Sequence, residues 1–575
     1  MKTDRSTTQF VLAIILAGSL MAVISVMGAL GQAAPIAQPS AEVVEWSAPS
    51  EHEQLNCRYG TTVPNRGDQG PWMPVMEAGW YNTFNMWGTY PPDNPYPGPL
   101  QSMTQAGQSD VPVNEATFVP VIRVQQNVID GIPQPTYTFN PPLAAIPYEI
   151  RSYSYNYPPG TVWLIGNEPE VGLPQDYAYP EVYAQAYHEA YHFLKSLDPT
   201  YQIGIASMAQ ATPGRLSYLT QVWDTYQQMY HTRLPVDVWN LHLYILSEIS
   251  PNGGNSDGRI AIGTDPALAI KGYDPLLGPP DTECSRDNVY CRAEHDDINI
   301  FIDQIVAFRT WMREHSEQIK PLIISEYSIL YDYTVDDDDD DGDVCIGVKD
   351  EFGNCFTPER IKAFMAATFE FFETATDPEL GYPYDNNKLV QQWAWHSMET
   401  NGSGRSSNLL KKNYNRFEPG DLDGLTEVGL FYREQVLSRD TYVNLMGVHA
   451  LSHGVNPTRT LSIDFVNNGN IAITKTMTVT FYADELLTQV ISSTVLTPEI
   501  DGCVQQIYRA SVDWLDELPA GAHYFWVKLN SDAAIVESDE TDNLLRGVVI
   551  VGGHHVFMPI AFDVPYLPDT FPLRR

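Results

Sequence analysis

Two patterns of apolar and polar positions divide this chain of 575 residues. From residue 76 to 437, short apolar runs alternate with longer segments in which apolar residues recur every three or four positions. Continuous apolar runs are typical of buried parallel strands, and the wider spacing is typical of amphipathic helices. Their alternation predicts an α/β fold, and the length of the segment fits a TIM (β/α)8 barrel.

The individual elements of this barrel follow from the same runs. We expect strands at residues 77–84, 118–124, 161–167, 202–207, 236–244, 321–327 and 389–395. We expect helices at residues 180–197, 216–230, 298–315, 357–374 and 425–437. Between residues 84 and 161 a regular barrel needs two strands, but the pattern shows only one. Either a short strand lies within residues 100–117, or the barrel is irregular on its N-terminal side.

After the barrel the pattern changes to one of strands and turns alone. Residues 440–551 alternate between apolar and polar positions, which predicts an antiparallel β-sandwich. A Pro-Ala-Gly turn at residues 519–521 and an acidic ending at 535–543 resemble the bacterial immunoglobulin-like domains called CARDB. The resemblance implies a spacer or binding module. Residues 552–575 then form a Pro-rich tail.

The first residues have the composition of an export signal. Two cations among the first five residues precede an uncharged, largely apolar stretch at residues 10–30, and small residues follow it. This order predicts a signal peptide over residues 1–34, cleaved near Ala33 or Ala34, and therefore a secreted protein. The apolar stretch is also long enough for an uncleaved anchor at the cell surface, so both alternatives stay open. Residues 35–75 are expected to be a linker or irregular lead-in.

Net charge narrows the choice of partners. The chain has 33 Lys and Arg against 72 Asp and Glu, which gives a formal charge of −39 at pH 7. A field of that sign repels nucleic acids and anionic lipids. We therefore expect no nucleic-acid partner, and no membrane contact beyond an N-terminal anchor. The oligomeric state stays open.

Two glutamates lie at the ends of apolar strands. Glu168 directly follows one expected strand, and Glu326 lies next to the end of another. Barrels of this class keep their reactive groups at the carboxyl ends of strands, so both carboxylates are expected at one mouth. Between them along the chain, His242 and Tyr244 share one face of a strand because side chains alternate with a period of two.

An Asn-Glu pair, a His-x-Tyr element, a second Glu and a Trp on successive strand ends resemble the clan A retaining glycoside hydrolases, which are built on (β/α)8 barrels. The resemblance implies hydrolysis of O-glycosidic bonds in a poly- or oligosaccharide, with no required cofactor. Glu168 would be the acid/base and Glu326 the nucleophile. Asn167 would bind a sugar hydroxyl, and Trp395 would stack on the sugar ring. Tyr244 would hydrogen-bond Glu326 and keep it ionised.

Three assignments stay open at this point. Arg123, near the end of an early strand, is either a substrate-binding residue or a surface cation beside a strand end. His242 either binds substrate or is a histidine satisfied by neighbours at the rim. The alternative to an enzyme is a non-catalytic carbohydrate-binding or adhesion protein on a glycosidase-like barrel. Decayed sites usually lose one carboxylate, and here both are present.

Export also favours disulfide bonds among the six cysteines. We expect two short loops to be closed by the pairs Cys284–Cys291 and Cys345–Cys355. Cys57 and Cys503 are left over and are candidates for free thiols.

A run of aspartates offers a candidate cation site. The spacing of Asp337, Asp339 and Asp341, followed by Gly342, resembles the start of a calcium-binding loop. The twelfth position of such a loop would be Val348 instead of Glu, so the match is incomplete. A structural calcium ion and a solvated acidic loop are the two interpretations.

Overall fold

The computed structural model describes residues 54–552, with gaps at 65–68, 70–71, 85–115, 153–156, 285, 334–346, 419, 456–457, 498–499 and 505. The expected signal peptide and the residues of the Pro-rich tail from 553 onwards lie outside the described residues. So do Asp337, Asp339 and Asp341 of the candidate calcium loop, and Cys345 of one expected disulfide. These expectations stay predictions. Among the residues that are described, no helix combines the length and apolar character needed to cross a bilayer.

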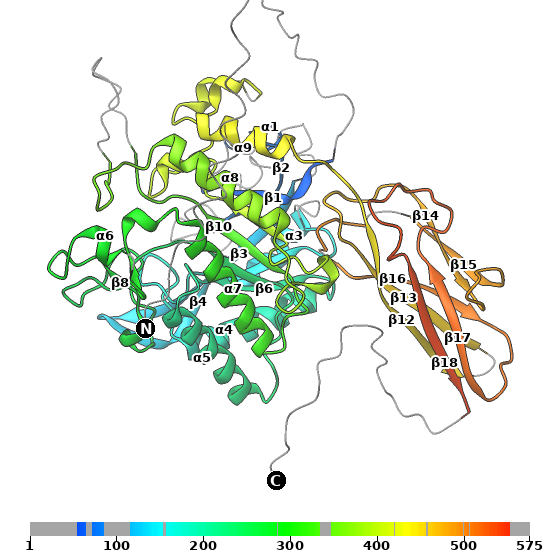
Figure 1. The fold of residues 1–575 in the computed structure, drawn as a ribbon. Coiled ribbons are helices and arrows are strands. Elements are labelled where there is room, and N and C mark those ends of the chain that lie inside the picture. The colour runs from blue at the N-terminus through cyan, green and yellow to red at the C-terminus, as the bar shows by residue number, and fades with distance from the viewer. Residues whose placement is uncertain are drawn as a thin grey trace, which may run out of the picture. The chain divides into compact units, whose positions relative to one another are not determined.

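Eight parallel strands form the wall of a barrel (Figure 1). In chain order they are β1 (Asn56–Thr62), β2 (Ala78–Thr83), β3 (Thr117–Ile129), β5 (Val162–Asn167), β6 (Gln202–Ser207), β7 (Trp239–His242), β10 (Leu322–Tyr327) and β11 (Gln392–Trp395). Neighbours around the ring follow the order β6, β5, β3, β2, β1, β11, β10, β7. The two end strands meet at a parallel bridge between Gly204 and Val238, so the ring is nearly closed. The predicted α/β barrel is confirmed. Strand β4 (Ile132–Asn140) extends β3 as an antiparallel hairpin.

The first barrel strand, β1, lies inside residues 35–75, where the sequence pattern indicated only an irregular lead-in. It pairs in parallel with β2 and β11, so the barrel needs neither trimming nor a strand hidden in residues 100–117. The strand reads NCRYGTT, with few apolar residues, yet all seven are buried. Arg58, for example, forms a fully buried ion pair with Asp385 at 2.8 Å. Distant polar partners make burial of this strand favourable, and a search for apolar runs could not find them.

Side chains of the strands divide into an inner and an outer core. Inside the ring, eight buried apolar side chains pack together: Trp80, Val119, Val121, Val162, Leu164, Val238, Ile323 and Ala394. Outward-facing positions pack against α4 (Pro180–Leu197), α5 (Pro213–Tyr230), α7 (Ile298–Glu314), α8 (Pro358–Thr374) and α9 (Glu427–Leu437). Each of these helices begins and ends within three residues of its expected bounds. Shorter helices are α1 (Met73–Met76) and α3 (Ile146–Ser152).

The long connection after β7 forms an ordered insertion. It contains β8 (Lys271–Gly272), α6 (Pro280–Glu283) and β9 (Val289–Tyr290). The expected disulfide Cys284–Cys291 is present and joins the end of α6 to the end of β9, which confirms that prediction.

An antiparallel β-sandwich follows the barrel, as expected. One sheet contains β12 (Leu445–Val455), β13 (Thr458–Asn467) and β16 (Tyr508–Trp514). The other contains β15 (Val490–Leu496), β14 (Met477–Tyr482), β17 (Gly521–Lys528) and β18 (Leu544–Val551). Buried apolar side chains of both sheets, among them Phe465 and Phe525, form one core. The alternation seen in the sequence is the alternation between this core and the outer faces.

A covalent bond joins the sandwich to the barrel. Cys57 of β1 and Cys503, which precedes β16, form a disulfide across 446 residues of sequence. Both cysteines were candidates for free thiols, and the structure shows instead that they are bonded to each other. Beside the disulfide, Arg58 donates from Nη2 to the carbonyl of Asn468 at 3.1 Å. Contacts between residues this far apart depend on the tertiary fold, so the spacing of cysteines along the chain could not reveal the pair.

Candidate active site

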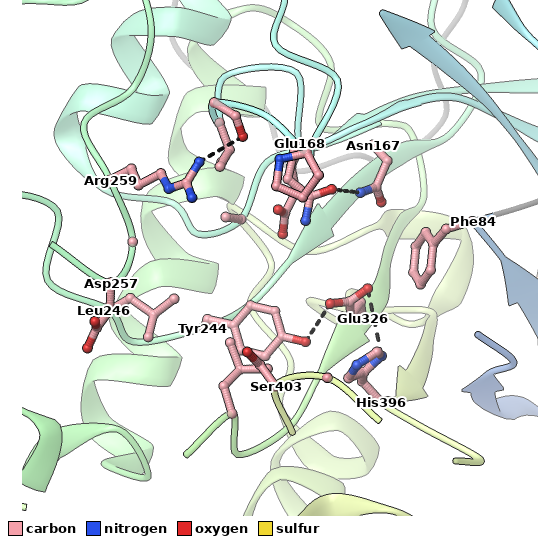
Figure 2. A pocket seen from close by; sticks show the side chains of 18 of the residues that line it. Phe84, Asn167, Glu168, Tyr244, Leu246, Asp257, Arg259, Glu326, His396 and Ser403 are labelled. Atoms are coloured by element: carbon pink, nitrogen blue, oxygen red, sulfur yellow. Dashed lines mark hydrogen bonds and ion pairs between the residues drawn. The ribbon is translucent and has the colours of Figure 1, made fainter. Parts of the chain in front are cut away.

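A cleft of about 520 Å³ opens at the carboxyl ends of the barrel strands (Figure 2). Most strand ends contribute to its lining: Phe84 after β2, Arg123 of β3, Asn167 and Glu168 at β5, Ala209 after β6, Tyr244 after β7, Glu326 of β10 and His396 after β11. Loops after β5, β7 and β11 complete the wall. Parallel strands bring their carboxyl ends to one rim, so residues far apart in sequence meet here.

Glu168 enters the cleft through an unusual backbone conformation. Its φ angle is +47°, in the left-handed region that residues other than glycine rarely adopt. The N–H of Glu168 donates to the carbonyl of Ser207 at 2.9 Å, and its carbonyl accepts from the N–H of Val171 at 3.0 Å. Neighbouring loops therefore hold a strained backbone at the point where β5 ends. Strain of this kind concentrates at functional sites.

The two glutamates meet in the cleft. One carboxylate oxygen of Glu168, one of Glu326 and one ring nitrogen of His242 lie within 4.8 Å of one another. Both glutamates line the cleft, and their side chains are 9% and 12% exposed. Each carboxylate is thus mostly enclosed by protein but open to a ligand. A single bound molecule can contact both.

His242, at the end of β7, lies between these two carboxylates. Its Nδ1 is 2.9 Å from Oε1 of Glu168, and its Nε2 is 2.8 Å from Oγ of Ser207 and 3.9 Å from Oε2 of Glu326. Burial lowers the pKa of this imidazole, but the charges of Glu326 and Glu168 outweigh burial and raise it above its ordinary value. The ring is fully buried, so it acts on the carboxylates from behind the cleft wall.

Glu326 has partners that favour its ionised form. The hydroxyl of Tyr244 donates to Oε1 at 2.6 Å, and Nδ1 of His396 lies 3.9 Å from Oε2. Burial raises the pKa of Glu326, but His242, His396 and the Tyr244 hydrogen bond together hold it below its ordinary value. Figure 2 shows Tyr244 and His396 on either side of this carboxylate.

Asn167 has a free hydrogen-bond acceptor at the cleft. Its Nδ2 donates to Oε1 of Gln175 at 2.9 Å, and its N–H donates to Oδ2 of Asp176 at 2.6 Å. Among the described residues, its Oδ1 has no partner although it is buried. Leaving a buried carbonyl oxygen unpaired costs free energy, and a hydroxyl group of a ligand would remove that cost.

Arg123 also lies at the cleft. Its guanidinium forms an ion pair with Asp176, whose carboxylate is buried, and donates from Nη2 to the carbonyl of Pro174 at 3.2 Å. The structure thus places Arg123 at the candidate site, and its charge is already matched by that of Asp176. It orders the loop that follows Glu168.

Trp395 does not lie where the resemblance placed it. It is fully buried in the outer core, its Nε1 donates to the carbonyl of Ser407 at 2.8 Å, and its ring packs edge-on against Tyr327. In β11 the residue that faces the inside of the ring is Ala394. Side chains alternate along a strand, so Trp393 and Trp395 both point outward and cannot stack on a ligand in the cleft.

Among the lining residues that reasoning from sequence missed, two lie next to strand ends. His396 follows Ala394 by two positions, so the inward register of β11 would have identified it. Phe84 ends the strand expected at 77–84 and offers the cleft an aromatic ring, which meets the His242 ring edge-on at 6.0 Å. Both could have been identified from the sequence if the inward-facing side of each strand had been known.

Behind the cleft, one buried arginine connects three loops. Arg215 of α5 forms ion pairs with Glu170, two residues beyond Glu168, and with Glu248, after β7. All three side chains are fully buried. Oε1 of Glu170 also accepts from the N–H of Ala209, a lining residue after β6, at 2.8 Å. This network therefore connects the loops after β5, β6 and β7.

Glu168, His242 and Glu326 are residue types that can ligate a metal ion, and their atoms are close enough to share one. Both ring nitrogens of His242 already have partners, Glu168 and Ser207. A metal ion here would have to displace one of these hydrogen bonds. The arrangement therefore fits proton transfer between the groups better than metal ligation.

No protein-family model matches the chain, and no curated protein matches it. Solved structures similar to it include glycoside hydrolases. The GH39 enzyme from Xanthomonas axonopodis pv. citri is 12% identical with a TM-score of 0.36, covering 80% of this chain and 93% of that chain. A monomeric beta-xylosidase from Caulobacter crescentus CB15 is 9% identical with a TM-score of 0.38, covering 80% and 94%. A CARDB domain from Pyrococcus furiosus is 15% identical with a TM-score of 0.17, covering 20% and 97%. Likenesses this weak carry no argument about function, which rests on the geometry of the cleft.

Proposed function

We propose that this protein is a retaining glycoside hydrolase that cleaves O-glycosidic bonds of a poly- or oligosaccharide. The carboxylate pair carries the proposal. Retaining enzymes hold their two carboxyl groups about 5–5.5 Å apart, whereas inverting enzymes need about 6.5–9.5 Å to admit a water molecule. Oxygens of Glu168 and Glu326 within 4.8 Å of each other favour the retaining geometry.

In this proposal the reaction is a double displacement. Glu326 attacks the anomeric carbon while Glu168 gives its proton to the leaving oxygen, so the glycosidic bond breaks and a glycosyl ester of Glu326 forms. Glu168, now ionised, takes a proton from water as the water oxygen attacks the same carbon. The ester bond breaks, the sugar leaves, and both glutamates return to their starting forms.

The surroundings of each carboxylate support this division of roles. Hydrogen bonding from Tyr244 and the nearby imidazoles hold the pKa of Glu326 low, although burial alone raises it, as a carboxylate nucleophile requires. The free Oδ1 of Asn167 can accept a hydrogen bond from a sugar hydroxyl. Phe84, which lies on the same side of the cleft as His396 in Figure 2, can pack against a sugar face. No cofactor is needed for these steps.

We further propose that the protein acts outside the cytoplasm. The N-terminal order of cations, apolar residues and small residues is that of an export signal. The disulfides Cys57–Cys503 and Cys284–Cys291 suit an oxidising compartment. Mass spectrometry of the N-terminus of protein from culture medium checks this: a start after Ala33 or Ala34 is expected, and a full-length chain in membranes would indicate an anchor.

Activity on a panel of aryl glycosides and polysaccharides tests the function. Glu326→Ala should abolish turnover of every substrate, since no glycosyl ester can form. Glu168→Ala should still react in the first step with aryl glycosides that have good leaving groups, because these need little protonation. Azide should then replace water in the second step and give a glycosyl azide of retained configuration.

Glu379→Ala is the matched control, because Glu379 is a surface carboxylate paired with Arg313. It should match the wild type in every assay. Three outcomes would contradict the proposal: turnover by Glu326→Ala, a first product of inverted configuration in proton NMR, or saccharide binding without any turnover. The last would favour the non-catalytic carbohydrate-binding protein.

A further inference from the structure

Arg259, from the insertion after β7, brings a cation into the cleft that no described carboxylate neutralises. Its guanidinium lines the cleft, and its Nη1 donates to the carbonyls of Gly172 at 3.0 Å and Leu173 at 2.7 Å. Within the described part of the chain, Arg259 makes no ion pair. The other lining arginine, Arg123, is paired with Asp176.

The acidic residue that the same loop contributes to the cleft lining is already engaged. Asp257 accepts a hydrogen bond from the hydroxyl of Tyr331 at 2.8 Å and forms an ion pair with Arg292 at 3.4 Å. Asp257 therefore does not neutralise the positive charge of Arg259, although the chain as a whole carries a formal charge of −39. Of the two described arginines that line the cleft, Arg259 is the one without a carboxylate partner.

The backbone around Arg259 is built to hold it there. Its φ angle is +55°, in the left-handed region that side-chain-bearing residues seldom adopt. The buried Arg215 donates from Nη2 to the carbonyls of Gly258 at 2.5 Å and Arg259 at 3.4 Å. Two carbonyls hold Nη1, and among the described residues the Nη2 and Nε edges of the guanidinium have no partner. These edges can bind an anion through two parallel hydrogen bonds.

Position assigns Arg259 to one half of the cleft. Its carbonyl partners, Gly172 and Leu173, belong to the loop that follows Glu168, the residue that protonates the leaving oxygen in the proposed reaction. In Figure 2 Arg259 lies on the far side of Glu168 from Phe84. The reacting sugar would lie over Glu326 near Phe84, so the leaving group would extend towards Arg259.

We propose that the leaving-group half of this cleft binds an acidic substituent, such as the carboxylate of a uronic acid or a sulfate ester, through Arg259. This inference rests on the proposed glycosidase function and adds the substrate class to it. Saccharides that carry an anion on the leaving side of the cleaved bond are then preferred over neutral ones of the same linkage.

The test compares two glycosides of whichever sugar is hydrolysed, one with a 3-carboxyphenyl and one with a 3-carbamoylphenyl leaving group. Wild-type kcat/KM should favour the carboxylate by at least about tenfold, from a charge-assisted hydrogen bond. Arg259→Gln, which keeps a side-chain donor for the two carbonyls, should lower kcat/KM far more for the carboxylate substrate than for the carbamoyl substrate, so that the preference is lost. Arg259→Lys should keep part of the preference.

Arg286→Gln is the matched control: it removes a cation of the same insertion whose partner is Glu283, and it should keep the full preference. No preference in the wild type, or an equal loss on both substrates in Arg259→Gln, would overturn the proposal. If no glycoside is turned over, the proposed glycosidase function is wrong. A binding measurement then tests whether Arg259 recognises an anionic sugar. Ligand-observed NMR should then show glucuronate bound over glucose by the wild type and Arg286→Gln, with the preference lost in Arg259→Gln; any other result overturns it.

Discussion

Glu168 and Glu326 carry the same carboxylate group but have different neighbouring side chains. Glu326 accepts a hydrogen bond from Tyr244 and lies 3.9 Å from a ring nitrogen of both His242 and His396. Glu168 has a strained backbone and a single short contact to His242. His242 lies between the two glutamates, and its charge helps to hold the pKa of Glu326 below its ordinary value.

Tyr244→Phe should move the pH profile in a defined direction. Burial raises the pKa of Glu326, and the imidazoles and the tyrosine hydroxyl hold it down, so removing the hydroxyl should raise it. Glu326 must be ionised to act as the nucleophile in the proposed reaction. The acid limb of kcat/KM should therefore shift to higher pH, and activity at the optimum should fall about tenfold or more. An unshifted acid limb would mean that this hydrogen bond does not control Glu326.

Phe84 and Trp395 should respond to substitution in opposite ways. Phe84→Ala should raise KM roughly tenfold, because an apolar contact with the sugar is lost, and should change stability little. Trp395→Ala should cost about 3–5 kcal/mol of unfolding free energy, as expected for a large core side chain. Trp395→Phe, a milder change, should keep KM near the wild-type value. A stable Trp395→Phe variant with a greatly raised KM would place Trp395 at the substrate after all.

The loops at the barrel mouth act together because α5 ties them to one another. Arg215 contacts the loop after β5 through Glu170 and the loop after β7 through Glu248 and Gly258. It therefore connects the loop that carries Glu168 with the loop that carries Arg259. Two buried carboxylates depend on this one guanidinium for their counter-charge, and such groups are costly without it.

Arg215→Met should destabilise the barrel by about 3–5 kcal/mol, since it leaves Glu170 and Glu248 buried without a cation. Arg215→Lys should be less damaging, because it keeps the charge but loses the planar fork that reaches both carboxylates. Chemical denaturation of each variant measures the loss, and assays well below the melting temperature measure kcat/KM. Equal stability of Arg215→Met and the wild type would show that the network contributes nothing.

Across the full chain, one long-range disulfide connects the first barrel strand to the β-sandwich. Cys57 and Cys503 are separated by 446 residues, and the nearby contact of Arg58 with Asn468 is also buried. Tyr382 of the barrel packs with Val466 and Val504 of the sandwich in a small apolar cluster. Covalent, polar and apolar contacts thus occur together at the junction. The sandwich therefore packs against the barrel in addition to being linked to it by the chain.

Replacing both Cys57 and Cys503 with Ser should lower stability by about 2–5 kcal/mol, because a very long loop is released in the unfolded chain. The Cys284→Ser, Cys291→Ser double variant opens a loop with a sequence separation of only 7 and should lose less. Calorimetry under oxidising and reducing conditions distinguishes them. If both double variants melt at the same temperature, loop length is not what this disulfide contributes.

Sequence alone determined the features that depend on local periodicity. The alternation of strands and helices and the change to antiparallel strands after residue 440 follow from apolar spacing. The start of α4 follows from Pro180, because proline suits the first turn of a helix. The same is true of Glu168 and Glu326, since a break in an apolar run marks a strand end wherever the strand lies in the fold. Period-two alternation also put His242 and Tyr244 on one face, and both contact the glutamates.

Only the tertiary structure decided the features that depend on distant partners. Burial of β1 in the barrel depends on the ion pair between Arg58 and Asp385. Cys57 forms a disulfide with Cys503 because the sandwich folds against the barrel. Trp395 faces outward because the register between neighbouring strands, and no local pattern, sets which face points inward. Arg259 reaches the cleft from a loop whose path no periodicity describes. Local spacing carries information over a few residues, whereas these contacts join residues tens to hundreds of positions apart.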